Sequence, residues 1–163
     1  MSKGPAVRLI SVGKLKEAYF EAAFAEYAKR LGAFCAFESI SVPEQRLGDS
    51  PSEKEIDAAL AREASEIARH IPQGAAVCAF CVEGELKSSE ELAGLMRAWL
   101  AGGKRTICFL IGGSCGLDDS LKRSAEVRLS MSRMTFPHHL FRVMAAEQLY
   151  RAFMIGAGRK YHK

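Results

Sequence analysis

The chain has 163 residues, of which 48% are hydrophobic and 26% are charged, and its formal net charge is +4. This length fits one domain with its own core, because domains usually hold about 100 to 200 residues and a chain of about 150 residues buries close to 70% of its extended surface. No apolar run approaches the roughly 20 residues that cross a bilayer, and the first apolar stretch is too short and too broken by Arg8 for a signal peptide, so we expect a cytoplasmic protein without a membrane span.

The predicted elements alternate between strands and helices. In chain order we expect a strand at 7–12, a helix at 17–31, a strand at 34–42, a polar loop at 43–51 and a helix from 52 to about 71. A strand at 75–82, a helix from 88 to about 100, a strand at 106–111, a short helix from about 119, a strand at 127–131 and a helix from 137 to about 155 follow. Ser52 with Glu55 and Ser88 with Glu91 have the capping-box pattern that starts a helix. Alternation of this kind with continuous apolar strands predicts an α/β fold, with a mainly parallel sheet and helices on both faces.

The five cysteines (Cys35, Cys78, Cys81, Cys108 and Cys115) raise the question of a disulfide or a metal site. Cys78 and Cys81 form a C-x-x-C within a predicted strand, where side chains three positions apart point to opposite faces and cannot share one ion. No second C-x-x-C pair and no C-x-x-H pair completes a zinc site, so we expect no metal. An odd number of cysteines without a signal peptide favours buried, reduced thiols.

Two segments that follow predicted strands are candidates for a ligand site. Gly112-Gly113-x-x-Gly116 follows the strand at 106–111, and ligands of open α/β sheets bind beyond the carboxyl ends of strands. Its spacing matches neither G-x-G-x-x-G nor a phosphate-binding P-loop, so a structural turn explains it as well as a site does. In the segment 129–138, Ser132 and Thr135 are suited to bind a ligand, but capping of the following helix is the simpler interpretation.

The last predicted helix is apolar almost all round, which is typical of a helix buried against its own sheet and also against a partner subunit. His138 and Arg142 stand four residues apart on one face of this helix. A titratable imidazole and a cation in such surroundings are consistent with a site and, equally, with a structural role. Glu147 and Arg151 are most simply a structural ion pair.

Positive charge is concentrated in the C-terminal quarter of the chain. Residues 122–163 hold nine Lys or Arg against two acidic residues, whereas the other 121 residues hold 14 basic and 17 acidic ones. Such asymmetry fits a surface that faces a polyanion, and it fits a solvated basic surface equally well. The last residues, 159–163, add an aromatic ring and cations of the kind that contact RNA.

Four segments carry a resemblance that extends over the whole chain. They are FLIGGSCGL at 109–117, LSMSRMTFPH at 129–138, EQLYRAF at 147–153 and YHK at 161–163. In this order and spacing they resemble the RlmH family of 23S rRNA pseudouridine N3-methyltransferases, which belongs to the SPOUT superfamily. The resemblance implies a single SPOUT domain over residues 1–163 that has a C-terminal trefoil knot and acts as a homodimer. The knot rests on the resemblance alone, since knots are essentially absent among folds in general.

The resemblance also implies S-adenosylmethionine as the cofactor and N3 of a pseudouridine in 23S rRNA, within the assembled ribosome, as the substrate. By matching motifs, the cofactor site comprises Phe80, Gly112, Met131, Ser132, Arg133, Met134, Thr135 and Phe136. N3–H of a uracil-type ring is a weakly acidic imide that must lose its proton before the nitrogen takes a methyl group, so His138 or His162 would act as the base. Arg142 would stabilise the developing ring anion, and Tyr161 would stack on the target base.

Two other functions are open from the sequence. One is a non-catalytic rRNA-binding α/β protein that uses its basic tail on rRNA and its glycine turn only for structure. The other is a SPOUT methyltransferase that acts on transfer RNA. A nucleotide-dependent oxidoreductase is disfavoured, because the chain has no dinucleotide-binding fingerprint.

Overall fold

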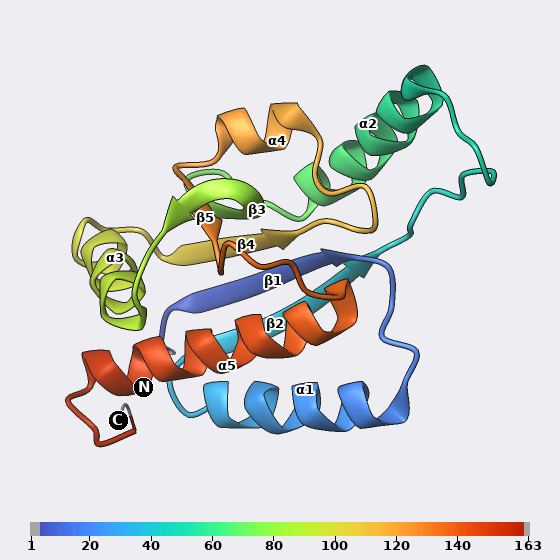
Figure 1. Ribbon diagram of the computed structural model, residues 1–163. Coiled ribbons are helices and arrows are strands. Elements are labelled where there is room, and N and C mark those ends of the chain that lie inside the picture. Colours follow the sequence, from blue (N-terminus) through green and yellow to red (C-terminus); the bar gives the residue numbers. More distant parts are fainter. Residues whose placement is uncertain (1–3, 162–163) are drawn as a thin grey trace.

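The computed structural model describes residues 4–161, whose strands form one parallel sheet (Figure 1). The elements are β1 (Ala6–Val12), α1 (Ala18–Leu31), β2 (Ala36–Val42), α2 (Glu53–Arg69), β3 (Ala76–Leu86), α3 (Ser89–Ala101), β4 (Thr106–Ile111), α4 (Asp119–Ser124), β5 (Val127–Ser130) and α5 (His138–Gly156). The strand order is β2-β1-β4-β3-β5, and all four pairs of neighbouring strands are parallel. The predicted α/β fold with a parallel sheet is confirmed.

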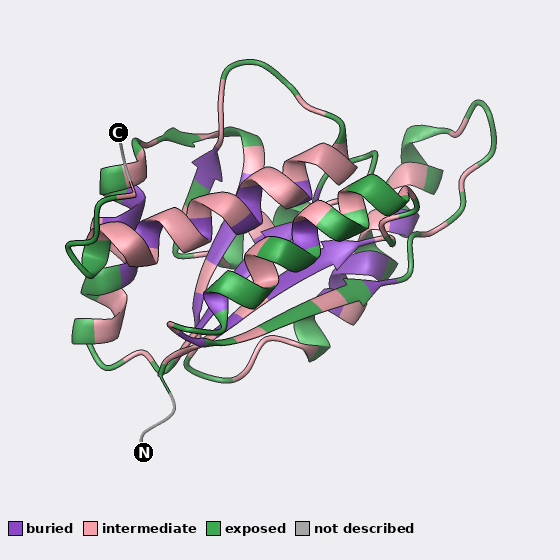
Figure 2. Cartoon of the chain, turned by 90° about the horizontal axis from the view of Figure 1, so that it is seen from below, coloured by how far each residue is buried: buried purple, intermediate pink, exposed green. Residues whose placement is uncertain are grey.

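Helices cover both faces of the sheet, as predicted. α1, α3 and α5 lie on one face, and α2 and α4 lie on the other (Figure 1). Alternate side chains of β1 divide between the two cores, because Val7 and Leu9 pack with α1, α3 and α5, whereas Ile10 and Val12 pack with α2 and α4. Buried residues concentrate in the central strands, and exposed residues lie on helix surfaces, in loops and on the edge strand β2 (Figure 2).

Both predicted capping boxes are present. The Ser52 hydroxyl accepts a hydrogen bond from the Glu55 amide, and the Glu55 carboxylate accepts one from the Ser52 amide. Ser88 and Glu91 repeat this arrangement at the start of α3. Each box satisfies two of the backbone N–H groups that a helix start leaves without partners, which explains why these two starts are readable from sequence. Within the described part of the chain, no helix is long and apolar enough to cross a membrane.

Two of the boundaries that differ from the prediction lie close together in the structure. β3 continues to Leu86, beyond the predicted end at 82, because after an irregularity between Phe80 and Glu85 it pairs with β5 a second time, Glu85 opposite Leu129. α5 begins at His138, and Pro137 is its N-cap instead of part of its first turn. Both differences lie at the carboxyl ends of β3 and β5, which are neighbours in the sheet.

Candidate active site

A cavity of about 380 Å³ opens at the carboxyl ends of β3, β4 and β5. Its walls come from residues 80–83 of β3, residues 111–117 after β4 and residues 130–136 (without 133) after β5, together with Lys122, His138 and Phe141. Ligands of open parallel sheets bind at this edge, and the volume lies in the range of small-molecule sites. The glycine turn is therefore part of a cavity wall, in addition to being a turn.

Seven of the eight residues predicted to hold the cofactor line this cavity. They are Phe80, Gly112, Met131, Ser132, Met134, Thr135 and Phe136. The eighth, Arg133, is exposed and is not part of the cavity lining. The fold thus brings together a segment of β3 and the connections that follow β4 and β5, which are far apart in the sequence. A cofactor contact by Arg133 stays a prediction.

Phe80 forms a rigid aromatic wall of the cavity. It is only 5% exposed, and its ring stacks on Phe109 with centroids 6.0 Å apart. Phe141 of α5 meets the same ring edge-to-face at 5.2 Å. A ring that is held from two sides can pack against a flat heteroaromatic ligand without losing further conformational freedom.

The loop between β5 and α5 is shaped by its own hydroxyl groups. Ser130 donates a hydrogen bond to the carbonyl oxygen of Ser132 at 2.9 Å, and the Ser132 hydroxyl accepts one from the Met134 amide at 3.0 Å. No side chain caps the start of α5, so the interpretation that Ser132 or Thr135 caps this helix is wrong. The hydroxyl of Ser132 instead closes a local turn, which is a competing use of serine near a helix start.

The glycine turn after β4 is compact. Gly116 has a φ of +80°, and its amide donates a hydrogen bond to the carbonyl oxygen of Gly113 at 3.0 Å. A Cβ atom on Gly112 would lie 2.3 Å from the backbone carbonyl of Gly116. Glycine is therefore required at position 112 by the close approach of the two backbones, and at position 116 by the backbone angle.

Residues that the sequence did not single out also line the cavity. Lys122 forms an ion pair with Glu83 at 2.6 Å, and this contact lowers the pKa of the Glu83 carboxyl and raises that of Lys122. Lys122 was visible only as one cation of the basic C-terminal quarter. The pairing joins β3 to α4, and no local sequence pattern predicts it.

The cysteines are free thiols, but they are not all buried. Cys35, Cys78 and Cys108 are buried as predicted, whereas Cys81 is half-buried and Cys115 is exposed. Cys81 and Cys115 both line the cavity, because Cys81 lies in the irregular part of β3 after Phe80 and Cys115 lies in the glycine turn. Among residues 4–161, no group of three or more His, Cys, Asp or Glu is placed to hold a metal ion.

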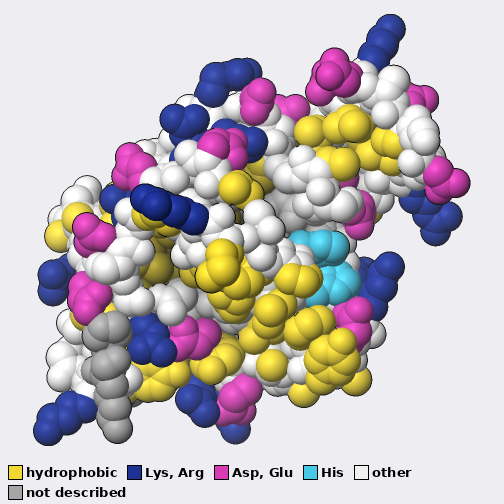
Figure 3. All heavy atoms as spheres, in the orientation of Figure 1, with side chains coloured by type: hydrophobic (Ala, Val, Ile, Leu, Met, Phe, Trp, Pro, Cys, Tyr) yellow, Lys and Arg dark blue, Asp and Glu magenta, His cyan; other side chains and the backbone are white. Residues whose placement is uncertain are grey.

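His138 stands at the edge of the cavity, at the first position of α5. Its ring lies 4.3 Å from that of His139, which contacts the Glu17 carboxylate at 2.9 Å. Burial lowers the pKa of His138, and the neighbouring His139 lowers it further. On the face drawn in Figure 3, histidine side chains gather at one place, beside a broad group of hydrophobic side chains. A half-buried neutral imidazole at a cavity edge is suited to accept a proton.

Arg142 is placed apart from the cavity, although it lies one helical turn after His138. It is only 3% exposed, and it donates hydrogen bonds to the carbonyl oxygens of Val12 and Gly13 at 3.1 and 3.0 Å. Burial lowers the pKa of its guanidinium. These contacts assign Arg142 to the junction between α5 and the end of β1, and a role on the substrate anion stays a prediction.

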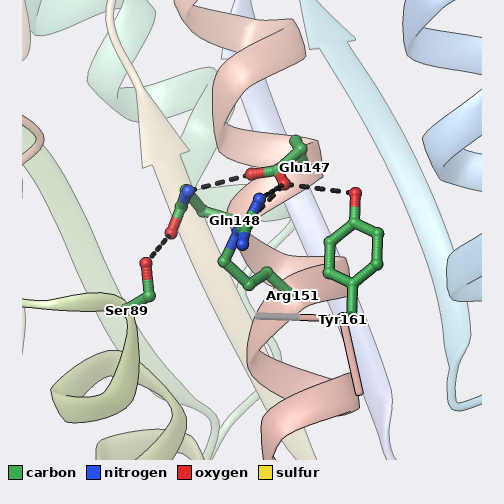
Figure 4. Close-up of polar contacts among 5 residues, drawn as sticks. All are labelled: Ser89, Glu147, Gln148, Arg151 and Tyr161. Carbon is green, nitrogen blue, oxygen red and sulfur yellow. Dashed lines mark hydrogen bonds and ion pairs between the residues drawn. The ribbon is translucent and has the colours of Figure 1, made fainter. Parts of the chain in front are cut away.

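Tyr161 lies at the far end of α5 (Figure 4). Its hydroxyl donates a hydrogen bond to the Glu147 carboxylate at 3.3 Å, and the guanidinium of Arg151 lies 4.8 Å from the centre of its ring. Glu147 and Arg151 form the predicted ion pair, with 3.0 Å between the carboxylate and Nε of Arg151. Gln148 extends the network to Ser89 of α3. Tyr161 therefore does not meet His138 within one chain, and His162 lies outside the described residues.

The chain resembles known proteins in sequence and in fold. A family model described as "Predicted SPOUT methyltransferase" matches residues 6–162. Proteins named ribosomal RNA large subunit methyltransferase H from Limosilactobacillus reuteri (strain DSM 20016) and Clostridium botulinum (strain Langeland / NCTC 10281 / Type F) are each 43% identical, over 96% of this chain and 99% of theirs. A solved structure of a probable methyltransferase from Bordetella pertussis Tohama I, 17% identical, has a TM-score of 0.55 and covers 90% of this chain and 95% of that one. A probable methylase family protein from Haemophilus influenzae Rd KW20, 14% identical, has a TM-score of 0.54 over 96% of this chain and 70% of that one. At these identities, the two structures show only that the fold is shared.

Proposed function

Because the chain belongs to the SPOUT methyltransferase family and, within it, to the RlmH group of ribosomal RNA large subunit methyltransferases, we propose that it methylates N3 of a pseudouridine in 23S rRNA. The observation that carries the proposal is the cavity in which residues 80–83 of β3 meet the connections after β4 and β5, beside the half-buried imidazole of His138. A single domain over residues 1–163 with a C-terminal trefoil knot is part of the same proposal.

The cavity residues fit S-adenosylmethionine as the methyl donor. Phe80 and Phe141 offer aromatic surface for an adenine ring, and Met131 adds a polarizable thioether. The hydroxyls of Ser132 and Thr135 provide polar groups among these apolar walls, which is the usual composition of a cofactor site. When bound, S-adenosylmethionine supplies a methyl group on a positively charged sulfur, which a nitrogen lone pair can attack.

His138 is the base in this proposal. N3–H of the pseudouridine ring lies between two carbonyl groups, and the nitrogen lone pair becomes a good nucleophile only after the proton leaves. The lowered pKa of His138 leaves its imidazole neutral near pH 7, so that Nδ1 or Nε2 can take the proton. Of the two imidazoles proposed from the sequence, His138 is the one that the described chain places at the cavity.

The charge distribution supports a polyanionic substrate. Residues 122–163 carry nine basic and two acidic residues, and part of this segment lines the cavity, including Lys122 and residues 130–136 without 133. Contacts of Lys and Arg with phosphates supply most of the sequence-independent affinity of proteins for nucleic acids. The large ribosomal subunit is the source of 23S rRNA in this proposal, in agreement with the names of the relatives at 43% identity.

Homodimerisation belongs to the same proposal. α5 has 19 residues, which correspond to a length of about 28 Å at the usual rise of 1.5 Å per residue. His138 lies at its first residue and Tyr161 beyond its last, so one chain cannot bring both side chains to one cavity. A second copy of the chain would supply Tyr161 and His162 to the cavity of the first.

The test is transfer of labelled methyl groups from S-adenosylmethionine to unmodified ribosomes, isolated 23S rRNA and transfer RNA. We expect label in the 23S rRNA of ribosomes, on N3 of a pseudouridine by mass spectrometry of the nucleosides. His138→Ala should lower turnover at least a hundredfold, with unchanged affinity for S-adenosylmethionine, because loss of a general base typically costs 10²–10⁴-fold. Label in transfer RNA alone would favour the other SPOUT activity, and no label in any RNA from folded protein that binds rRNA would favour the non-catalytic alternative.

A further inference from the structure

A second cavity, of about 580 Å³, lies on the other side of His138. We name it the Glu44 cavity, and it is lined by Gly13, Lys14, Lys16, Ser41, Pro43, Glu44, Ser114, His138 and His139. Ser114 and His138 line both this cavity and the one at the carboxyl ends of β3, β4 and β5. A group bound in the Glu44 cavity would therefore lie across the imidazole of His138 from a group bound in the first.

Glu44 is held in position by contacts on both sides. Its Oε1 atom accepts hydrogen bonds from the Ser114 hydroxyl at 2.9 Å and, more weakly, from the Ser114 amide at 3.4 Å. The next residue, Gln45, donates its amide to the carboxylate of Glu63 at 2.9 Å, and Glu63 is only 6% exposed. An otherwise irregular connection between β2 and α2 is thus anchored at the residue that carries the carboxylate.

One oxygen of Glu44 is available to a ligand. Both contacts with Ser114 use Oε1, and within residues 4–161 no donor contacts Oε2. A carboxylate can accept several hydrogen bonds, so the anchored group retains an acceptor at the wall of the cavity. The free carboxylate oxygen can accept a hydrogen bond from an N–H group of a ligand, provided that the ligand does not itself offer an acceptor to that N–H.

Two cations stand at the same cavity. Lys14 and Lys16 of the connection between β1 and α1 are exposed, and in the described part of the chain neither forms an ion pair. His139, in contrast, is engaged with Glu17. Unpaired ammonium groups beside a cavity of this size are suited to the phosphates that flank a single nucleotide.

The donors of the target base match this arrangement. Pseudouridine is joined to its ribose through C5, so both ring nitrogens carry a hydrogen, whereas uridine has an N–H at N3 only. If N3 faces His138 and the first cavity, N1–H points away from them along the ring edge. A hydrogen-bond acceptor there distinguishes the two nucleosides, because uridine has its glycosidic bond at N1 and would leave a charged acceptor without a donor.

We propose that the Glu44 cavity receives the target nucleotide, that Lys14 and Lys16 contact its phosphates, and that Glu44 selects pseudouridine over uridine by accepting N1–H. The assignment rests on the proposed methyltransferase function and adds to it the residue that reads the modified base. Glu44 also contacts Ser114 of the glycine turn, so the group that reads the base is attached directly to a wall of the first cavity.

The test compares methylation of ribosomes whose 23S rRNA carries pseudouridine or uridine at the target position. We expect the wild-type chain to prefer pseudouridine, and we expect Glu44→Met, which removes the acceptor, to lower the ratio of the two kcat/KM values about tenfold to hundredfold. The kcat/KM for pseudouridine should decrease more than that for uridine, because only pseudouridine loses a hydrogen bond with Glu44. Glu44→Gln, which keeps a neutral acceptor of the same shape, should give an intermediate ratio.

Affinity for S-adenosylmethionine and the thermal unfolding temperature report whether each variant is folded. If Glu44→Met does not fold, Glu44→Gln carries the test, with a ratio at least several-fold below that of the wild type. A wild type that methylates uridine as well as pseudouridine, or folded variants that keep the wild-type ratio, would overturn the selection by Glu44 and leave the methyltransferase function standing. A wild type that methylates neither substrate contradicts the proposed function itself.

The phosphate contacts are tested by salt dependence. Lys14→Ala with Lys16→Ala should weaken binding to the pseudouridine-containing ribosome and lower the slope of log K against log salt by about one per lysine. The matched control is Lys29→Ala, which removes an exposed lysine from the last turn of α1, at the opposite end of that helix. An unchanged slope in the double variant, or an equal change in the control, would remove the lysines from the proposal.

Discussion

Arg142 of α5 donates a hydrogen bond to the backbone carbonyl oxygen of Val12, the last residue of β1, over a distance of 3.1 Å. The same nitrogen donates a second bond to the carbonyl oxygen of Gly13. The guanidinium thus joins the first turns of α5, which carry His138, to the strand end that precedes Lys14 and Lys16. Through this contact the first cavity and the Glu44 cavity have a common structural support.

Arg142→Ala should lower the free energy of unfolding by about 2–4 kcal/mol, because two carbonyl groups lose their donor and a buried side chain leaves a void. Urea unfolding followed by circular dichroism measures this difference. The control is Arg97→Ala on α3, an exposed arginine whose loss should change stability by less than about 0.5 kcal/mol. Equal stability of the two variants would show that the buried contacts of Arg142 contribute nothing to the fold.

Turnover should decrease at acid pH with the titration of His138. Burial and His139 lower its pKa, against opposing effects of Glu44 and Glu17, so kcat/KM should be constant near pH 7 and fall only below the ordinary histidine value of about 6.5. His139→Gln removes one of the lowering charges, and the acidic limb should move to higher pH. An acidic limb that stays in place in His139→Gln would assign the titration to another group.

The same pKa has a consequence for stability. A histidine whose pKa is lower in the folded than in the unfolded chain binds fewer protons when folded, so its contribution to stability is lost as the pH falls below about 6.5. His138→Gln should therefore reduce the loss of unfolding free energy between pH 7 and pH 5. Denaturant unfolding at the two pH values gives the comparison, and identical losses in both proteins would contradict the lowered pKa.

Gly112→Ala should reduce affinity for S-adenosylmethionine at least tenfold, because the new Cβ would lie 2.3 Å from the Gly116 carbonyl and the turn would have to shift. Isothermal titration calorimetry measures the affinity directly. Gly94→Ala is the matched control, since Gly94 lies inside α3 with no atom within 4 Å of the added Cβ. The control should bind normally and gain about 0.5–1 kcal/mol of stability from helix propensity. A similar affinity in both variants would show that the turn plays no part in binding.

Cys115 should react first with a thiol reagent, and S-adenosylmethionine should protect it. It is exposed and lines the first cavity, whereas burial raises the pKa values of Cys35 and Cys78 to about 12. Mass spectrometry of peptides after timed alkylation gives the rate at each cysteine. Protection of Cys115 by an added RNA but not by the cofactor would place the cofactor elsewhere.

Local signals predicted most of the fold. The capping boxes at Ser52 and Ser88, the continuous apolar strand at 106–111 and the alternation of elements depend on residues close in sequence, and the structure confirms them. Seven of the cofactor residues predicted from matching motifs also line one cavity. The predicted capping of α5 was wrong, because the Ser132 hydroxyl accepts a hydrogen bond from the nearer Met134 amide.

Long-range partners account for what the sequence missed. In the sequence, Glu44 is one residue of a polar loop, and only the fold places it beside Ser114, 70 residues away. Lys122 is one cation among several in the sequence, and only the fold pairs it with Glu83. The sequence placed Arg142 on the same helix face as His138. A hydrogen bond to a backbone carbonyl group of β1 sets the position of its guanidinium.

The sequence by itself determined the order and type of the elements and the parallel sheet, because helix starts and strand periodicity are set by neighbouring residues. The residues of the first cavity followed from the family resemblance. Only the tertiary structure decided that His138 stands between two cavities, that Arg142 is turned toward β1 and that Tyr161 lies at the far end of α5. Those placements follow from strand order and helix packing, which join residues more than a hundred positions apart and leave no periodic signal along the chain.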